Sequence, residues 1–139
     1  MGRILAVDDE LDMLTLLKLM IEGYTDHQVT VTNNPLEAVE LLDREKFDLL
    51  LTDLKMPGLD GMELLDLARK KDEDTVVMVI TAYGSLESAE EATAKGAFDF
   101  ITKPFRKDQI LLAIDKAMRW REMVLQNKEL RKRLEAQED

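Results

Sequence analysis

Short runs of aliphatic residues alternate along the first 105 residues of the chain with stretches in which apolar residues recur every three or four positions. Continuous aliphatic runs are typical of buried parallel strands, and the three-and-four spacing is typical of amphipathic helices. Their strict alternation predicts a doubly wound α/β fold, with a five-stranded parallel sheet, five helices and right-handed crossovers. The predicted strand cores are residues 4–7, 29–31, 47–52, 76–80 and 98–102.

Capping residues mark the ends of the predicted helices. Asn34 and Pro35 open the second helix, Asp60 precedes the third, and Ser85 is the expected N-cap of the fourth. Gly96 is the expected stop of the fourth helix. The first helix carries its repeating positions at Leu11, Leu14, Leu17, Lys18 and Ile21.

Polar residues close four of the five predicted strands. Asp8 and Asp9 follow the first strand, Asp53 follows the third, Thr81 ends the fourth and Lys103 ends the fifth. The carboxyl ends of parallel strands meet at one edge of a sheet, where ligands of such folds bind. We therefore expect three carboxylates, one hydroxyl and one ammonium on a single rim, a set that suits a divalent metal and a phosphoryl group.

Each of these residues taken alone has an ordinary structural explanation. Asp8 and Asp9 fit a helix N-cap beside an unrelated acid, and Asp53 fits a turn residue before Pro57. Together they predict more, because adjacent carboxylates repel unless a cation separates them. Mg²⁺ takes oxygen ligands, and a carboxylate held at a metal can become an aspartyl phosphate. Pro104 restricts Lys103 to an extended conformation and makes a cis bond accessible.

Composition limits the classes of function. A net charge of -10 argues against nucleic-acid binding by this segment. The absence of cysteine excludes disulfides and thiolate metal sites and fits a reducing cytoplasm. The start of the chain shows no signal-peptide pattern, and no apolar run is long enough to span a membrane, so no membrane partner is expected.

The last quarter of the chain predicts one long helix, because residues 106–138 contain neither glycine nor proline. We divide the chain into a domain over residues 1–118 and a linker helix over residues 119–139. The linker carries a stripe spaced like the a and d sites of a parallel coiled-coil dimer, with a polar amide at one a site; a frayed, solvated helix is the alternative. The stripe consists of Trp120, Met123, Asn127, Leu130, Leu134 and Gln137.

From residue 3 to about residue 118 the chain closely resembles the receiver domains of two-component response regulators. The resemblance lies in four motifs, at residues 7–10 (VDDE), 51–61 (LTDLKMPGLDG), 79–82 (VITA) and 100–105 (FITKPF). It implies a flavodoxin-like fold with strand order 2-1-3-4-5. It also implies a signalling module that catalyses only its own phosphotransfer and autodephosphorylation, with a histidine kinase as partner.

The resemblance gives each motif residue a role. Asp53 is the expected phosphoacceptor, Thr81 and Lys103 contact the phosphoryl group, and Thr81 works with Phe100 as a switch. Without the neighbouring motif, Phe100 is an ordinary core aromatic. Lys55 and Tyr83 flank the site where receivers vary, and their bulk indicates a moderately long-lived acyl phosphate. The expected Mg²⁺ ligands are Asp8 (mainly through water), Asp9, Asp53 and the backbone carbonyl of Lys55.

Residues 84–89, 95–100 and 126–131 are similar to receivers of the NtrC type, which belong to sigma-54-dependent transcription activators. No phosphate-binding loop or helix-turn-helix of such an output domain is present in this sequence. A homodimer is expected through the linker helix, the face of the fourth helix, fifth strand and fifth helix, or both.

Three alternatives remain open at this point. The receiver could belong to a sensor or kinase, or serve as a dimerisation module without phosphorylation. A phosphatase of the haloacid dehalogenase type also uses an aspartate nucleophile, but it needs an aspartate where Lys55 stands.

Overall fold

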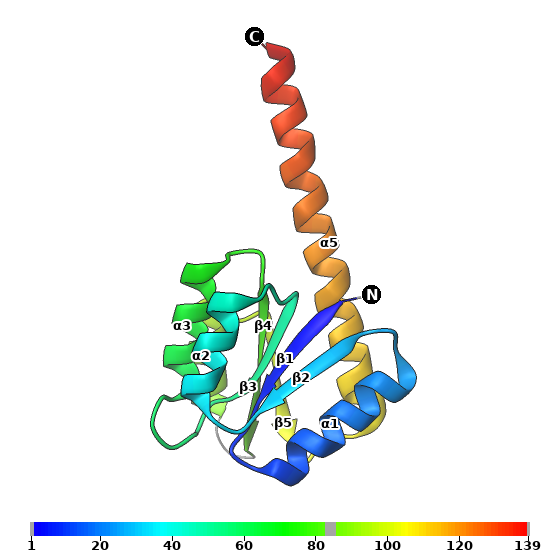
Figure 1. Cartoon of the computed structure of the whole chain (residues 1–139). Helices are drawn as coiled ribbons and strands as arrows, with labels where there is room; N and C mark the ends of the chain where they lie inside the picture. Colours follow the sequence, from blue (N-terminus) through cyan, green and yellow to red (C-terminus); the bar gives the residue numbers. More distant parts are fainter. Residues whose placement is uncertain (1, 83–85, 139) are drawn as a thin grey trace.

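The computed structural model describes residues 2–82 and 86–138, and it shows five strands alternating with five helices (Figure 1). This confirms the predicted element order. The strands are β1 (Arg3–Val7), β2 (Gln28–Thr32), β3 (Leu49–Asp53), β4 (Val76–Ala82) and β5 (Asp99–Lys103). The helices are α1 (Leu11–Tyr24), α2 (Pro35–Arg44), α3 (Gly61–Lys71), α4 (Leu86–Ala94) and α5 (Lys107–Glu138).

All strand pairs are parallel, and their order in the sheet is β2-β1-β3-β4-β5, as predicted. The register sets Val7 opposite Thr52, Asp53 opposite Ile80, and Thr81 opposite Thr102. Because the strands start and stop together, the polar residues that close β1, β3, β4 and β5 reach the same edge of the sheet.

Successive side chains of each strand enter opposite cores, as the two-residue period of a strand requires. Ile4 and Ala6 pack with Leu14 of α1 and Ile114 of α5. The alternate residues of the same strands pack against the other face, with the buried side chains of α2, α3 and α4. Figure 1 shows α1 and α5 on one side of the sheet and α2 and α3 on the other.

The caps decide where the helices begin and end. The Asn34 side chain accepts the amide of Leu36 at 3.0 Å, and that of Asp60 accepts the amide of Glu63 at 2.9 Å, which confirms both starts. Gly96 follows α4 with a φ of +114° that suits glycine, as expected for the stop. Ser85, the expected cap of α4, lies outside the described residues.

Two expectations about α1 are wrong. Leu11 is exposed, because it starts the helix beside the rim and only the later positions of its face meet the sheet. The N-cap of α1 is Glu10, without a side-chain cap, so the N-cap explanation of Asp8 and Asp9 fails. Asp8 serves the helix start differently, since its Oδ1 accepts the amide of Glu10 at 2.9 Å.

Helix α5 runs without interruption to Glu138 and leaves the body at the end of the sheet opposite the carboxyl ends of the strands (Figure 1). The single helix agrees with the pattern of residues 106–138. The division of the chain at residue 118 stays a prediction. No helix among the described residues is both long enough and apolar enough to cross a bilayer.

Candidate functional site

A single ammonium group joins the first, third and fifth strands at the rim. Lys103 Nζ lies 2.9 Å from Asp8 Oδ2 and 3.1 Å from Asp53 Oδ2. Asp8 is 1% exposed and Asp53 is 8% exposed, so both carboxylates lose most of their water. Buried carboxylates need a cation partner. The three residues therefore form one charge cluster, although Lys103 lies 95 positions after Asp8 and 50 positions after Asp53 in the sequence.

The electrostatics of Lys103 follow from this arrangement. Burial by itself lowers the pKa of the Lys103 ammonium, but its hydrogen bonds to Asp8 and Asp53 outweigh burial, so its pKa lies above the ordinary lysine value. Lys103 is therefore fully charged at neutral pH. The peptide bond between Lys103 and Pro104 is cis, one of the two isomers that the sequence left accessible.

The Asp53 carboxylate is oriented from both sides. Its Oδ1 accepts the amide of Lys55 at 3.1 Å, while its Oδ2 faces Lys103. The start of α3 packs directly behind it, because Gly61 donates its amide to the Leu54 carbonyl at 3.0 Å. The carboxylate is thus held at the carboxyl end of β3, on the rim where the sequence places it. Gly61 stands in the motif at residues 51–61, but its close packing against the loop after β3 could not be predicted from the sequence pattern.

Two further acids, Asp9 and Glu10, follow the cluster residue Asp8. One carboxylate oxygen each of Asp8, Asp9 and Glu10 lies within 4.8 Å of the others, with Asp9 and Glu10 exposed. Oxygen donors of this kind, beside the buried Asp53, fit a hard divalent cation such as Mg²⁺. Glu10 was not among the expected ligands, although its place directly after two aspartates was a signal.

Thr81 lies on β4, the strand next to that of Asp53, and Phe100 lies on β5, the edge strand beyond it. Thr81 is buried near the end of β4, which continues to Ala82, and it pairs in register with Thr102 of β5. Phe100 is half-buried on the edge strand and packs against the core on the side of α3 and α4.

Comparison with known families identifies the chain. Its residues 4–115 match the response regulator receiver domain. The chain belongs to this family. That membership confirms the resemblance inferred from the four motifs and removes the phosphatase alternative.

The relatives of this receiver include regulators of the NtrC type. It is 38% identical to the transcriptional regulatory protein GlrR of Escherichia coli over 96% of this chain and 32% of GlrR. It is 38% identical to the chemotaxis protein CheY of Listeria monocytogenes over 84% of this chain and 98% of that protein. The crystal structure of NtrX from Brucella abortus superposes with a TM-score of 0.90 at 30% identity, over 96% of this chain and 30% of that one. The receiver thus spans about a third of the first regulators it matches.

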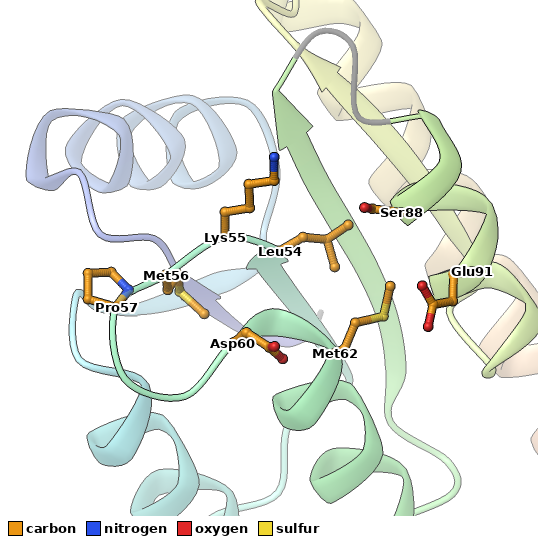
Figure 2. Close-up of a pocket in the computed structure, with 8 residues that line it drawn as sticks. All are labelled: Leu54, Lys55, Met56, Pro57, Asp60, Met62, Ser88 and Glu91. Atoms are coloured by element: carbon orange, nitrogen blue, oxygen red, sulfur yellow. The ribbon is translucent and has the colours of Figure 1, made fainter.

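An open hollow of about 540 Å³ lies beside the receiver site, between the loop after β3 and α4 (Figure 2). Its floor is apolar, and Lys55 and Glu91 stand at its edges. Tyr83, the expected partner of Lys55 in shielding the acyl phosphate, lies outside the described residues. The hollow is lined by Leu54, Lys55, Met56, Pro57, Asp60, Met62, Ser88 and Glu91.

The expected dimer residues do not join the rim. They lie on the part of α5 at and beyond the opposite end of the sheet (Figure 1). Trp120 is 49% exposed, and its ring lies 6.0 Å from that of Phe98. Met123, Asn127, Leu130 and Leu134 are all exposed, so the stripe presents apolar side chains to solvent.

Proposed function

We propose that this receiver is a phosphorylation-controlled switch whose Asp53 accepts a phosphoryl group from a histidine kinase. One observation carries the proposal. The Lys103 ammonium contacts both the buried Asp53 and the buried Asp8. The proposed nucleophile and a proposed metal ligand therefore lie beside the same cation. This set serves phosphoryl transfer, where positioning and charge neutralisation supply most of the catalysis.

We propose Asp8, Asp9, Asp53 and the backbone carbonyl of Lys55 as the residues that hold Mg²⁺, with Glu10 beside them. The donor set supports this, since Asp8, Asp9 and Glu10 group together after β1 and Lys103 links Asp8 to Asp53 at the end of β3. When bound, Mg²⁺ supplies positive charge that offsets the charge of the phosphoryl oxygens. Asp8 is the ligand that we expect to act mainly through water.

The proposed phosphoryl transfer from the kinase to Asp53 needs no further reagent. An Asp53 carboxylate oxygen attacks phosphorus, the new O–P bond forms, and the N–P bond of the kinase phosphohistidine breaks. The electron pair of the broken bond returns to the imidazole nitrogen. Lys103 neutralises negative charge on the transferred phosphoryl group. Its hydrogen bonds to Asp8 and Asp53 hold the ammonium beside the Asp53 carboxylate that accepts this group.

The proposed switch then follows from charge. Phosphorylation adds negative charge and acceptor oxygens to Asp53. The Thr81 hydroxyl is expected to donate to one of these oxygens, and Phe100 to turn inward into the space left. Their positions on β4 and β5 support this, because the movement would reach the surface of α4, β5 and α5. The result is a population shift toward a partner-binding state.

The output is a separate proposal. The match to GlrR extends over 96% of this chain, linker included, whereas the match to CheY covers 84%. This favours a cytoplasmic receiver that controls an output domain following α5, in a transcription regulator of the sigma-54-dependent class. We also propose that two copies pair through the α5 stripe, the α4-β5-α5 face, or both.

The direct test uses acetyl phosphate with Mg²⁺ and intact-mass detection of the aspartyl phosphate. The wild-type receiver is expected to gain one phosphoryl group, and Asp53→Asn none. Asp66→Asn, which changes an exposed carboxylate on α3, is the matched control and keeps the gain. Phosphorylation of Asp53→Asn at wild-type level would overturn the assignment.

A second measurement separates a working switch from a receiver that no longer responds. Beryllofluoride with Mg²⁺ imitates the phosphoryl group on an aspartate. Binding is expected to change the NMR signals of Thr81 and Phe100 and to leave the wild-type fold intact. Unchanged spectra would favour a dimerisation module that works without phosphorylation.

A further inference from the structure

The first turns of α5 beyond the body are fastened to it by ion pairs. Arg121 Nη1 lies 2.9 Å from Asp48 Oδ1, and Arg121 Nε donates to the carbonyl of Asp74 at 2.9 Å. Two helical turns later, Lys128 Nζ lies 2.8 Å from Glu73 Oε1 and 2.5 Å from Asp74 Oδ1. We call these five residues, Arg121, Lys128, Asp48, Glu73 and Asp74, the clamp.

The acidic side of the clamp is itself fixed to the sheet. Asp48 stands directly before β3 and accepts the amide of Arg3 at 2.7 Å through Oδ2. The loop before β4 is held by Arg69, whose Nη1 donates to the Glu73 carbonyl at 2.7 Å. The clamp therefore connects α5 to the starts of two central strands and not to a free loop.

Shielding from water differs between the two halves of the clamp. The side chains of Arg121 and Asp48 are 22% and 27% exposed, so their pair is screened less than an open surface pair. Lys128 is more exposed, yet its hydrogen bonds to Asp74 and Glu73 raise its pKa above the ordinary lysine value. Lys128 therefore stays charged at neutral pH and attracts Glu73 and Asp74.

The clamp and the stripe occupy different faces of α5. Trp120 and Asn127 hold a sites, so Arg121 and Lys128, one position later, hold successive b sites. The b sites of a two-stranded coiled coil point away from the seam. A receiver held through b sites therefore leaves Met123 and the later stripe residues turned to solvent, as their exposure shows.

We propose that the clamp sets the rotation of α5 about its axis, so that a second copy of this chain meets the stripe with both receivers held in one orientation. The second copy is the occupant that the stripe fits, because its apolar a and d spacing continues past the body and includes an amide at an a site. The orientation of the pair rests on the proposed dimer, whereas the clamp stands on its own contacts.

The clamp is tested with Arg121→Ser/Lys128→Ser against the control Arg131→Ser/Lys132→Ser, which removes two exposed cations of the same helix. Amide exchange over residues 119–130 of the unphosphorylated protein is expected to be about tenfold faster in the clamp variant, because three ion pairs and the Arg121 hydrogen bond to Asp74 are lost. Trp120 is expected to be quenched more readily by acrylamide. High salt should move the wild type toward the clamp variant. Equal exchange in both variants would overturn the clamp.

The orientation is tested by distances between two copies. The chain has no cysteine, so a spin label at Asp66→Cys marks only the receiver surface. Dimers with an intact clamp are expected to give a narrow distribution of label-to-label distances. In the clamp variant this distribution is expected to be at least twofold broader. Equal widths would overturn the orienting role. A protein that stays monomeric would overturn the proposed dimer, and amide exchange would still judge the clamp.

Discussion

A Cβ atom on Gly61 would lie 2.3 Å from the carbonyl oxygen of Asp53 and 2.6 Å from the Cα of Leu54. Both neighbours are backbone atoms, which cannot move aside as the end of a flexible side chain can. The start of α3 and the Asp53 end of β3 therefore form one tightly packed unit.

Gly61→Ala is expected to lower the free energy of unfolding by about 1–3 kcal/mol, because the added methyl group forces the backbone apart. The same shift moves the Asp53 carboxylate, so phosphorylation by acetyl phosphate should slow. Urea unfolding and the rate of mass gain measure the two effects. Gly23→Ala is the control, since nothing lies within 4 Å of its added methyl group. It should stabilise α1 by up to about 1 kcal/mol. A Gly61→Ala protein of wild-type stability would refute the packing argument.

Lys103→Met keeps an unbranched side chain but removes the ammonium between Asp8 and Asp53. We expect the free energy of unfolding at neutral pH to fall by about 1–3 kcal/mol, because two buried carboxylates lose their cation. The rate of phosphorylation should fall by about tenfold or more.

Two variants sharpen the Lys103 prediction. Adding Asp8→Asn to Lys103→Met should restore part of the stability, because the repulsion between the carboxylates disappears. Lys95→Met removes the exposed pair with Glu91 and should change stability by less than about 1 kcal/mol. Equal effects of Lys95→Met and Lys103→Met in urea unfolding would contradict the proposed importance of the rim cluster.

The pH dependence of stability depends partly on His27. Its Nδ1 accepts the amide of Gly2 at 2.9 Å, and burial lowers the pKa of His27, with Asp48 acting in the opposite direction. The unfolded chain therefore binds this proton at a higher pH than the folded protein. The contribution of His27 to the free energy of unfolding is complete above about pH 6.5, and it is lost as the pH falls through the pKa of His27 in the folded protein.

His27→Gln isolates this contribution, because glutamine can accept a hydrogen bond without titrating. Between about pH 7.5 and pH 5 the wild type should lose more unfolding free energy than His27→Gln. Denaturant titrations at each pH give the difference. A difference that stays constant over this range would show that His27 does not titrate differently on folding.

Two exposed leucines of α5 test which surface forms the proposed dimer. Leu130→Asp places a charge in the proposed seam and should weaken dimerisation by about tenfold or more, as measured by sedimentation. Leu112→Asp changes the face of β5 and α5 near Phe100. If Leu112→Asp dissociates the dimer and Leu130→Asp does not, the α4-β5-α5 face forms the interface.

The sequence by itself determined the architecture and the membership of the rim. Aliphatic runs that alternate with amphipathic helices predict a parallel α/β sheet with right-handed crossovers. The strand order 2-1-3-4-5 followed from the resemblance of the four motifs to receiver domains. The caps at Asn34 and Asp60 were also predictable, since each acts within three residues. Such caps depend only on residues close together in the sequence, so the local pattern is enough to predict them.

Only the tertiary structure decided which distant side chains meet. The sequence placed Lys103 at the rim, but the strand register and loop paths gave it both Asp8 and Asp53. The close approach of Gly61 and the attachment of Arg121 to Asp48 were likewise invisible in the pattern. These contacts join residues far apart in the chain, so they depend on how whole elements pack, which a local pattern does not specify.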